Sequence, residues 1–129
     1  MAATLDQYPQ RDALYRVLPQ GVAALNRYEN RVVMLDALSS ELWLRADGHT
    51  SLRDIARDIA GVSGLPLNAL QHTLSVMVVI LNSEGVLYPK DRPASLPYHL
   101  TLPQEEQDLD RMHASIIESG WLDEDGKGQ

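Results

Sequence analysis

The chain has 129 residues, with 11 basic and 18 acidic side chains and a formal net charge of −7. Its hydrophobic fraction of 44% is typical of a globular domain and excludes a collagen-like or wholly disordered chain. Cysteine is absent, which excludes disulfides, thiolate metal sites and a cysteine nucleophile. The longest apolar run, Val76–Leu81, is far shorter than the roughly 20 residues of a transmembrane helix. Residues 1–10 hold no basic residue and no apolar segment, so we expect a cytoplasmic protein without a secretory signal or membrane contact.

Charge and proline content divide the chain into parts. Residues 1–89 carry a net charge of −2, whereas residues 90–129 carry −5 in less than half the length. Four of the seven prolines fall within Pro89–Pro103, which predicts an extended connector because proline restricts φ and lacks an N–H. We therefore predict an N-terminal arm (1–12), a compact domain (13–88), a proline-rich linker (89–102) and an acidic C-terminal helix and tail (103–129).

The first half of the compact domain predicts three short β-strands. Tyr15–Leu18 alternates in polarity, and Pro19-Gln20-Gly21 after it is typical of a turn. Val22–Leu25 follows, and a polar stretch of hairpin length separates it from Arg31–Leu35. The last segment is rich in β-branched residues and is the strongest strand signal in the chain. The expected arrangement is an antiparallel meander.

Two helices are expected after the strands. Asp36 can cap the N-terminus of a helix over Ala37–Ala46. Ser51 resembles the start of a capping box for a second helix, which Gly61 and Gly64 would end. The residues predicted to face inward are Leu38, Leu42 and Trp43 on the first helix and Leu52, Ile55, Ala56 and Ile59 on the second.

A third helix is predicted over Leu67–Glu84, with Gly85 ending it and Val86–Tyr88 adding a short final strand. Apolar residues recur at helical spacing, but Val76–Leu81 also has strand propensity, so a buried strand remains an alternative. A helix that is apolar on nearly every side must be covered on more than one face. One face would meet the domain core, and the other needs a second cover.

Short motifs follow one another along Tyr15–Tyr88: Val33-x-Leu35, Leu42-Trp43, Asp47-Gly48-x-Thr50, Leu52-x-x-Ile55-Ala56 and Leu81-x-x-x-Gly85-Val86-Leu87. In this order they resemble the PqqD-like family, whose members recognise the precursors of ribosomally synthesised, post-translationally modified peptides (RiPPs). The sequence departs from the family at Gly64–Leu67, which lacks the acidic residues often found there. The segment after Pro89 has no counterpart in the short stand-alone members, so the resemblance implies nothing about it.

The resemblance implies a winged-helix-like α+β fold, with a three-stranded antiparallel sheet followed by three helices and here a C-terminal helical extension. It implies a protein that is not an enzyme and needs no cofactor or metal. Such proteins bind the leader segment of a precursor peptide as an added strand and present it to a separate modifying enzyme, often a radical SAM enzyme. The residues that match the strand edge and the groove wall are Arg31, Val32, Val33, Met34, Leu35, Leu70, Thr73, Leu74, Met77, Val78 and Leu81.

The residues themselves bear on other classes of function. The predicted third helix has no Lys or Arg, so we do not expect nucleic-acid binding. The four histidines show no metal-ligand spacing, and no catalytic constellation is visible. The alternative function is a winged-helix interaction module in a regulatory or assembly role without a peptide substrate. A homodimer stays open, and each apolar residue of the third helix could simply belong to the core.

The tail predicts one more helix. Thr101-Leu102-Pro103-Gln104 offers a helix start and Gly120 a stop, with an apolar stripe at Leu102, Leu109, Met112 and Ile116. An isolated helix of this length is marginal in water, so it must dock to persist. We expect it to pack on its own domain, on a second copy or on the partner enzyme, with Trp121 and Leu122 completing the contact. A mobile tail is the alternative.

Overall fold

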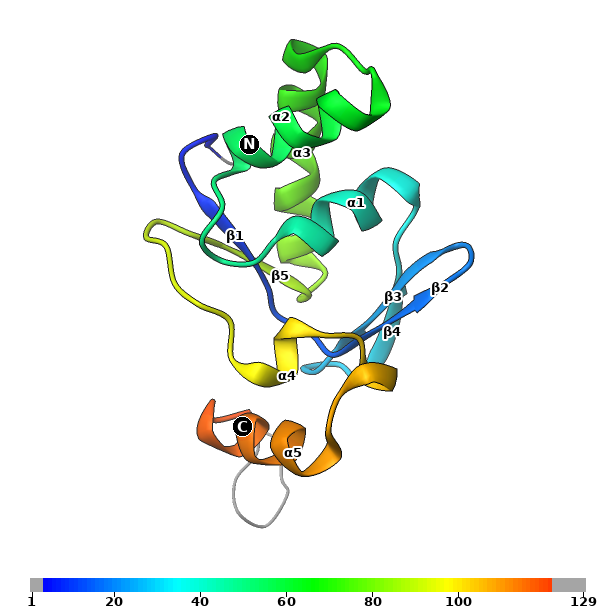
Figure 1. Cartoon of the computed structure of the whole chain (residues 1–129), viewed down its shortest axis with the longest axis vertical. Helices are drawn as coiled ribbons and strands as arrows, with labels where there is room; N and C mark the ends of the chain where they lie inside the picture. The colour runs from blue at the N-terminus through cyan, green and yellow to red at the C-terminus, as the bar shows by residue number, and fades with distance from the viewer. Residues whose placement is uncertain (1–3, 122–129) are drawn as a thin grey trace.

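The computed structural model describes residues 4–121 and shows a mixed α+β fold (Figure 1). A three-stranded antiparallel sheet has the order β2-β3-β4, and a separate two-stranded sheet pairs β1 with β5. Within the described residues, no helix is long and apolar enough to cross a membrane. The elements are β1 (Tyr8–Arg11), β2 (Tyr15–Leu18), β3 (Gly21–Asn26), β4 (Arg31–Met34), α1 (Ala37–Arg45), α2 (Leu52–Ser63), α3 (Leu67–Ser83), β5 (Leu87–Lys90), α4 (Tyr98–Thr101), η1 (Gln104–Glu106) and α5 (Leu109–Glu118).

The three predicted strands and the first two predicted helices are confirmed. The β2-β3-β4 meander is antiparallel throughout. Asp36 caps α1 by accepting a hydrogen bond from the Ser39 N–H at 2.8 Å, and Ser51 caps α2 by accepting from the Asp54 N–H at 3.2 Å. Helix α2 continues past Gly61, contrary to the prediction, and ends at Gly64, whose φ of 75° suits glycine.

The ambiguous apolar segment is a helix, since α3 spans Leu67–Ser83 without a break. Its buried face packs on α2 and β5 (Figure 1). The main core gathers around Trp43, whose Nε1–H donates to the Val86 carbonyl at 3.1 Å and whose ring meets Tyr15 edge-on. The predicted inward residues of α2 and the Leu42–Trp43 pair of α1 are buried in this core.

The segment predicted as an N-terminal arm contains a strand. Residues of β1 pair with β5 in an antiparallel register that sets Tyr8 opposite Lys90. Backbone bonds from Leu52 to Gln7 and from Arg53 to Leu5 then tie this segment to the start of α2. The sequence predicts an arm here and not a strand, because a short strand such as β1 is stabilised by a partner nearly 80 residues away.

The proline-rich segment is also more structured than predicted. Pro89 lies within β5, and α4 forms at Tyr98–Thr101. The tail helix does not begin at Thr101: Leu102 is extended, with φ −132° and ψ 156°, because the residue before a proline avoids the helical region. The helix α5 begins only at Leu109, capped by Asp108, and Gly120 follows its end.

The tail docks on its own domain and forms a second small core with Leu14. Ile116 and Trp121 are buried there as predicted, whereas Leu102 and Leu109 of the predicted stripe are exposed. Leu122 lies outside the described residues. In Figure 1, α5 (orange) lies at the opposite end of the molecule from the α2–α3 connection. The buried residues of the second core are Leu100, Ile116 and Trp121, with Leu14, Leu96 and Met112 packed against them.

Candidate functional site

Strand β4 is an edge of the three-stranded sheet, and its register determines which backbone groups point away from β3. The Leu35 N–H donates to the Val22 carbonyl at 2.9 Å. In an antiparallel ladder, alternate residues direct both backbone groups to the neighbouring strand. Val33 therefore bonds to β3, whereas the N–H and C=O groups of Val32 and Met34 point outward. Within residues 4–121, no hydrogen bond engages those outward groups.

An apolar groove lies between the start of α1 and the side of α3. Arg31 is tied to the C-terminal end of α3, and Asp36 shares a hollow with His72 in the first half of the helix. The first residue of β4 is therefore held at the C-terminal end of α3, and Asp36, two residues beyond the end of β4, faces the first half of that helix across the hollow. The hollow has a volume of about 450 Å³ and is lined by Asp36, Ser39, His72, Thr73, Val76, Met77, Ile80 and Leu81.

The structure brings only some of the predicted contact residues to this groove. Val32 and Met34 are 58% and 51% exposed on the outer face of the sheet, and Thr73 and Met77 line the hollow. Leu81 also lines the hollow, as a buried residue at its base. Arg31 forms ion pairs with Glu29 and Glu84. The remaining predicted residues face the domain core: Val33, Leu35, Leu70, Leu74 and Val78.

Leu70, Leu74 and Val78, which were predicted for the groove wall, are buried in the core and do not line the hollow. The stripe that they form is the one that packs on α2 and β5. The groove is lined instead by the next face of the helix, which contains Val76 and the 52% exposed Ile80. Both were missed because apolar residues occupy nearly the whole circumference of α3, so spacing alone does not separate the core face from the groove face.

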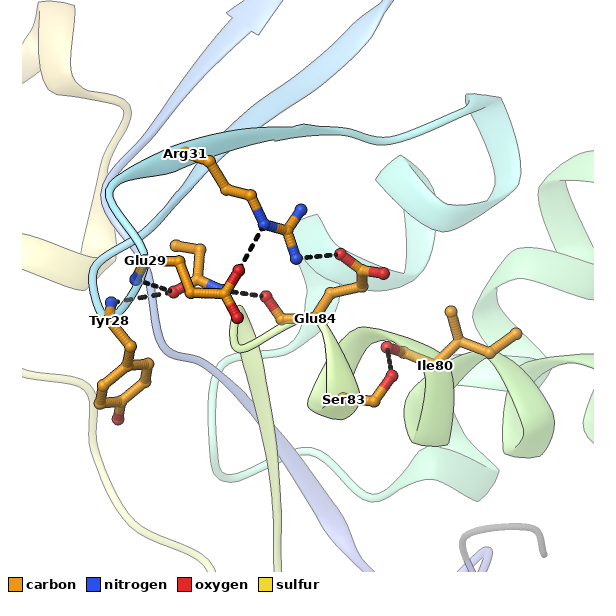
Figure 2. Close-up of polar contacts among 7 residues, drawn as sticks. Tyr28, Glu29, Arg31, Ile80, Ser83 and Glu84 are labelled. Carbon is orange, nitrogen blue, oxygen red and sulfur yellow. Dashed lines mark hydrogen bonds and ion pairs between the residues drawn. The ribbon is translucent and has the colours of Figure 1, made fainter.

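Hairpin and helix contacts hold one end of the groove together (Figure 2). The buried Asn26 amide donates to the Glu84 carbonyl at 2.7 Å, and its oxygen accepts from the Tyr28 and Glu29 N–H groups. Gly85 lies against Asn26: a Cβ there would come within 2.7 Å of the Asn26 amide nitrogen. These contacts fix the start of β4 beside the end of α3, and the polar side chain of Asn26 was not singled out from the sequence.

Arg31 completes that end of the groove. Its guanidinium donates to Glu29 at 2.7 Å and to Glu84 at 2.8 Å, and Figure 2 shows it between the two carboxylates. These hydrogen bonds, with Glu29 first, raise the pKa of Arg31. The charge of Arg31 is thus already matched by two carboxylates of its own chain.

The groove is mainly apolar along α3. Its wall on α3 carries no Asp, Glu, Lys or Arg from Leu67 to Ser83. Among residues 4–121, no group of three or more His, Asp or Glu side chains is placed to hold a metal ion. An open strand edge beside an apolar wall is an arrangement that accepts an extended peptide.

Comparisons with family models, with curated proteins and with solved structures give no match for this chain.

Proposed function

We propose that this protein binds the leader segment of a ribosomally made precursor peptide as an added strand on β4 and presents it to a separate modifying enzyme. The observation that carries the proposal is the pair of outward backbone positions at Val32 and Met34 beside the apolar groove of α3. A bound segment would take up the unpaired edge groups and direct alternate side chains into the groove. The sequence resemblance to the PqqD-like family, and the winged-helix-like arrangement it implies, support the same reading.

The hollow is large enough to receive a bulky apolar side chain of such a segment. Its volume of about 450 Å³ falls in the lower range of ligand pockets. The exposed side chains of Val76 and Ile80 would lose contact with water when it is filled. Burial of apolar surface stabilises the complex by about 25 cal/mol per Å², from which the ordering of the peptide must be subtracted.

The proposed contribution to the pathway is effective concentration. Holding the leader makes the encounter between the rest of the precursor and the active site of the partner enzyme an intramolecular one. No catalytic side chain of this protein is needed for that role. The enzyme supplied by another chain carries out the chemistry.

The test starts with the reading frames that neighbour its gene, where we expect a short precursor peptide and a maturation enzyme. The leader of that precursor is then titrated into the isotope-labelled protein and followed by NMR. We expect amide shifts at β4 and along the groove face of α3, with little change in α5. Shifts confined to α1 and α2 would contradict strand addition. Absence of both neighbouring genes would favour an interaction module without a peptide substrate.

A matched pair of variants on α3 sharpens the test. Ile80→Asp places a carboxylate in the groove and should weaken leader binding at least tenfold. Val79→Asp is the control, since Val79 is exposed on the same helix turn but does not line the hollow. Both positions are open to water, so circular dichroism should show both variants folded. Equal affinity of the two variants would count against the groove.

A proline substitution tests the β4 edge when it is placed at a residue whose N–H points away from β3. Val32→Pro removes an N–H that points away from β3, so it should reduce leader binding while the sheet persists. Val33→Pro does not test binding, because the Val33 N–H belongs to the β3–β4 ladder. Light scattering checks whether a second copy occupies the edge instead. A dimer that Val32→Pro dissociates would replace the peptide by a second copy as the occupant.

A further inference from the structure

The charges around the groove are unbalanced. Asp36 lies at one end, and Glu29 and Glu84 lie at the other. Among residues 4–121, the guanidinium that meets these carboxylates is that of Arg31, which is bonded to Glu29 and Glu84, whereas Arg27 of the same hairpin contacts Asp12 and the Trp121 ring. The wall between the two ends is uncharged along the whole of α3. Within the described part of the chain, an acidic segment would therefore meet no unpaired cation along the groove, whereas a basic one would meet an excess of carboxylates.

The end at Glu84 is the more negative of the two. Helix α3 finishes there with Glu84 at its C-cap and has no basic residue in its last turn, so the negative end of the helix dipole is offset only by Arg31. At the other end, Asp36 lies at the positive N-terminus of α1 and is already bonded to the Ser39 N–H. The two ends of the groove thus differ in electrostatic potential, and a cation is bound most favourably beside Glu29 and Glu84.

We infer that the segment bound in this groove carries a Lys or Arg at the end that lies beside Glu29 and Glu84. This inference rests on the proposed strand addition at β4. It adds a charge requirement for the bound segment and the direction in which that segment lies in the groove. The net charge of −7 on the whole chain acts in the same direction, because it attracts cationic segments at longer range. The apolar part of the segment fills the hollow, and the basic residue determines which end of the segment lies beside Glu29 and Glu84.

The experiment uses the full chain and a panel of synthetic peptides. Each peptide has a short alternating Val–Thr segment with Lys, Gln or Glu placed at one flank, and the series is repeated with the charge at the other flank. Affinities are measured by fluorescence anisotropy at low salt, and NMR confirms where each peptide binds. We expect Lys to bind roughly threefold or more tightly than Glu at one flank, since exposed ion pairs are individually weak. The difference should shrink as salt is raised.

The double variant Glu29→Gln with Glu84→Gln should invert this preference. It removes the two carboxylates and leaves the Arg31 guanidinium without its partners, so the Glu-flanked peptide should now bind more tightly than the Lys-flanked one. The Asn26 bond to the Glu84 carbonyl is a backbone contact and is unaffected. The control is Asp110→Asn with Glu118→Gln on α5, which changes the net charge equally and should keep the original order.

The outcomes separate this inference from the proposed function. If no peptide shifts the β4 signals, strand addition fails and the charge inference falls with it. If the peptides bind at β4 but Glu equals or exceeds Lys at both flanks, strand addition stands and the inference is overturned. The inference is also overturned if the double variant keeps the order of the parent protein.

Discussion

The two edges of the β2-β3-β4 sheet offer chemically equivalent backbone groups and have different surroundings. At β2, the outward Val17 N–H donates to the Glu105 carboxylate at 3.3 Å, so a side chain of the tail engages the edge. At β4, the outward groups of Val32 and Met34 have no partner within residues 4–121. An open edge is a liability in a protein that does not use it, because it templates pairing with other chains.

The difference between the edges comes from where the tail docks. Leu14, next to β2, packs against the tail core of Leu100, Ile116 and Trp121. The hollow is lined by Asp36, by Ser39 of α1 and by residues of α3, with no residue of the tail as far as Trp121. This part of the tail therefore does not line the hollow, although Trp121 contacts Arg27 of the β3–β4 hairpin. One edge is engaged by the tail, and the outward groups of the other edge have no hydrogen-bond partner within residues 4–121.

The tail core includes polar groups that must be satisfied. His99 is fully buried, its Nδ1 lies 2.7 Å from the Ser115 hydroxyl, and its carbonyl accepts from the Gln107 amide at 3.0 Å. The buried Arg11 donates to the Leu100 carbonyl at 3.0 Å and to the Leu44 carbonyl at 2.7 Å, and its burial lowers its pKa. Tail docking therefore depends on hydrogen bonds as well as on apolar contact, although the buried His99 Nε2 and Gln107 Oε1 have no partner within residues 4–121.

The largest expected effect separates the inward and outward positions of β4. Val33→Pro removes a ladder N–H and leaves a β3 carbonyl without its donor, so it should lower the free energy of unfolding by about 3 kcal/mol or more. Val32→Pro removes an outward N–H and should cost less than about 1 kcal/mol. Urea denaturation measures both. Equal losses would mean that the register assigned to the free edge is wrong.

The next effect is the pH dependence of tail docking. Burial first, and then the nearby Arg27 guanidinium, lower the pKa of His99 to about 4. In the unfolded chain the His99 pKa is near 6.5, so the unfolded state binds more protons between these values and stability falls as pH drops through this window. The loss reaches about 3 kcal/mol at most. Thermal melts between pH 7 and pH 4 should show it, and His99→Phe should remove most of the slope.

Truncating Trp121 tests the protected edge directly. Its ring meets the His99 ring in an edge-to-face contact. The Arg27 guanidinium lies over the Trp121 ring, 4.2 Å from the ring centroid. Trp121→Ala should lower the free energy of unfolding by about 3 kcal/mol, the lower end of the range for a buried aromatic residue, because the second core is small. Leader affinity should not change. A gain in leader affinity would indicate that the tail does reach the groove.

The smallest effect concerns Glu105 itself. Glu105→Ala frees the Val17 N–H at an exposed position, so the free energy of unfolding should change by less than about 1 kcal/mol. Self-association is a clearer readout than stability, because a β2 edge without the Glu105 contact pairs more readily with another copy of the chain. Light scattering at high protein concentration compares Glu105→Ala with Glu106→Ala, whose neighbouring carboxylate makes no bond to β2 among the described residues. An identical mass for both would show that apolar packing alone protects the edge.

Local signals predicted most of the elements of residues 13–88. Turn residues, the Asp36 and Ser51 caps and the apolar stripe of α2 act over a few residues, so they can be read without the rest of the chain. The same signals failed at the ends. Strand β1 depends on β5, and the start of α5 was displaced by the effect of Pro103 on Leu102.

The sequence predicted which strand and which helix form the candidate site, but it did not predict which face of the helix lines the groove. The strand β4 and the helix α3 were identified, but Val76 and Ile80 were not, because α3 is apolar on nearly every side. Which face of a helix becomes core depends on the elements that pack on it. Here α2 and β5 cover the Leu70–Leu74–Val78 face and leave the Val76–Ile80 face to the groove.

By itself, the sequence determined the order of the central strands and helices, their caps and the uncharged length of α3, since these depend on residues close together in the chain. Only the tertiary structure decided which N–H groups of β4 point outward, which edge the tail covers and which face of α3 stays open. Each of these depends on distant partners, such as the Leu35 bond to Val22 across the sheet and the Arg11 bond to Leu100, 89 residues away. Local propensity carries no information about such partners, because they meet only when the whole chain has folded.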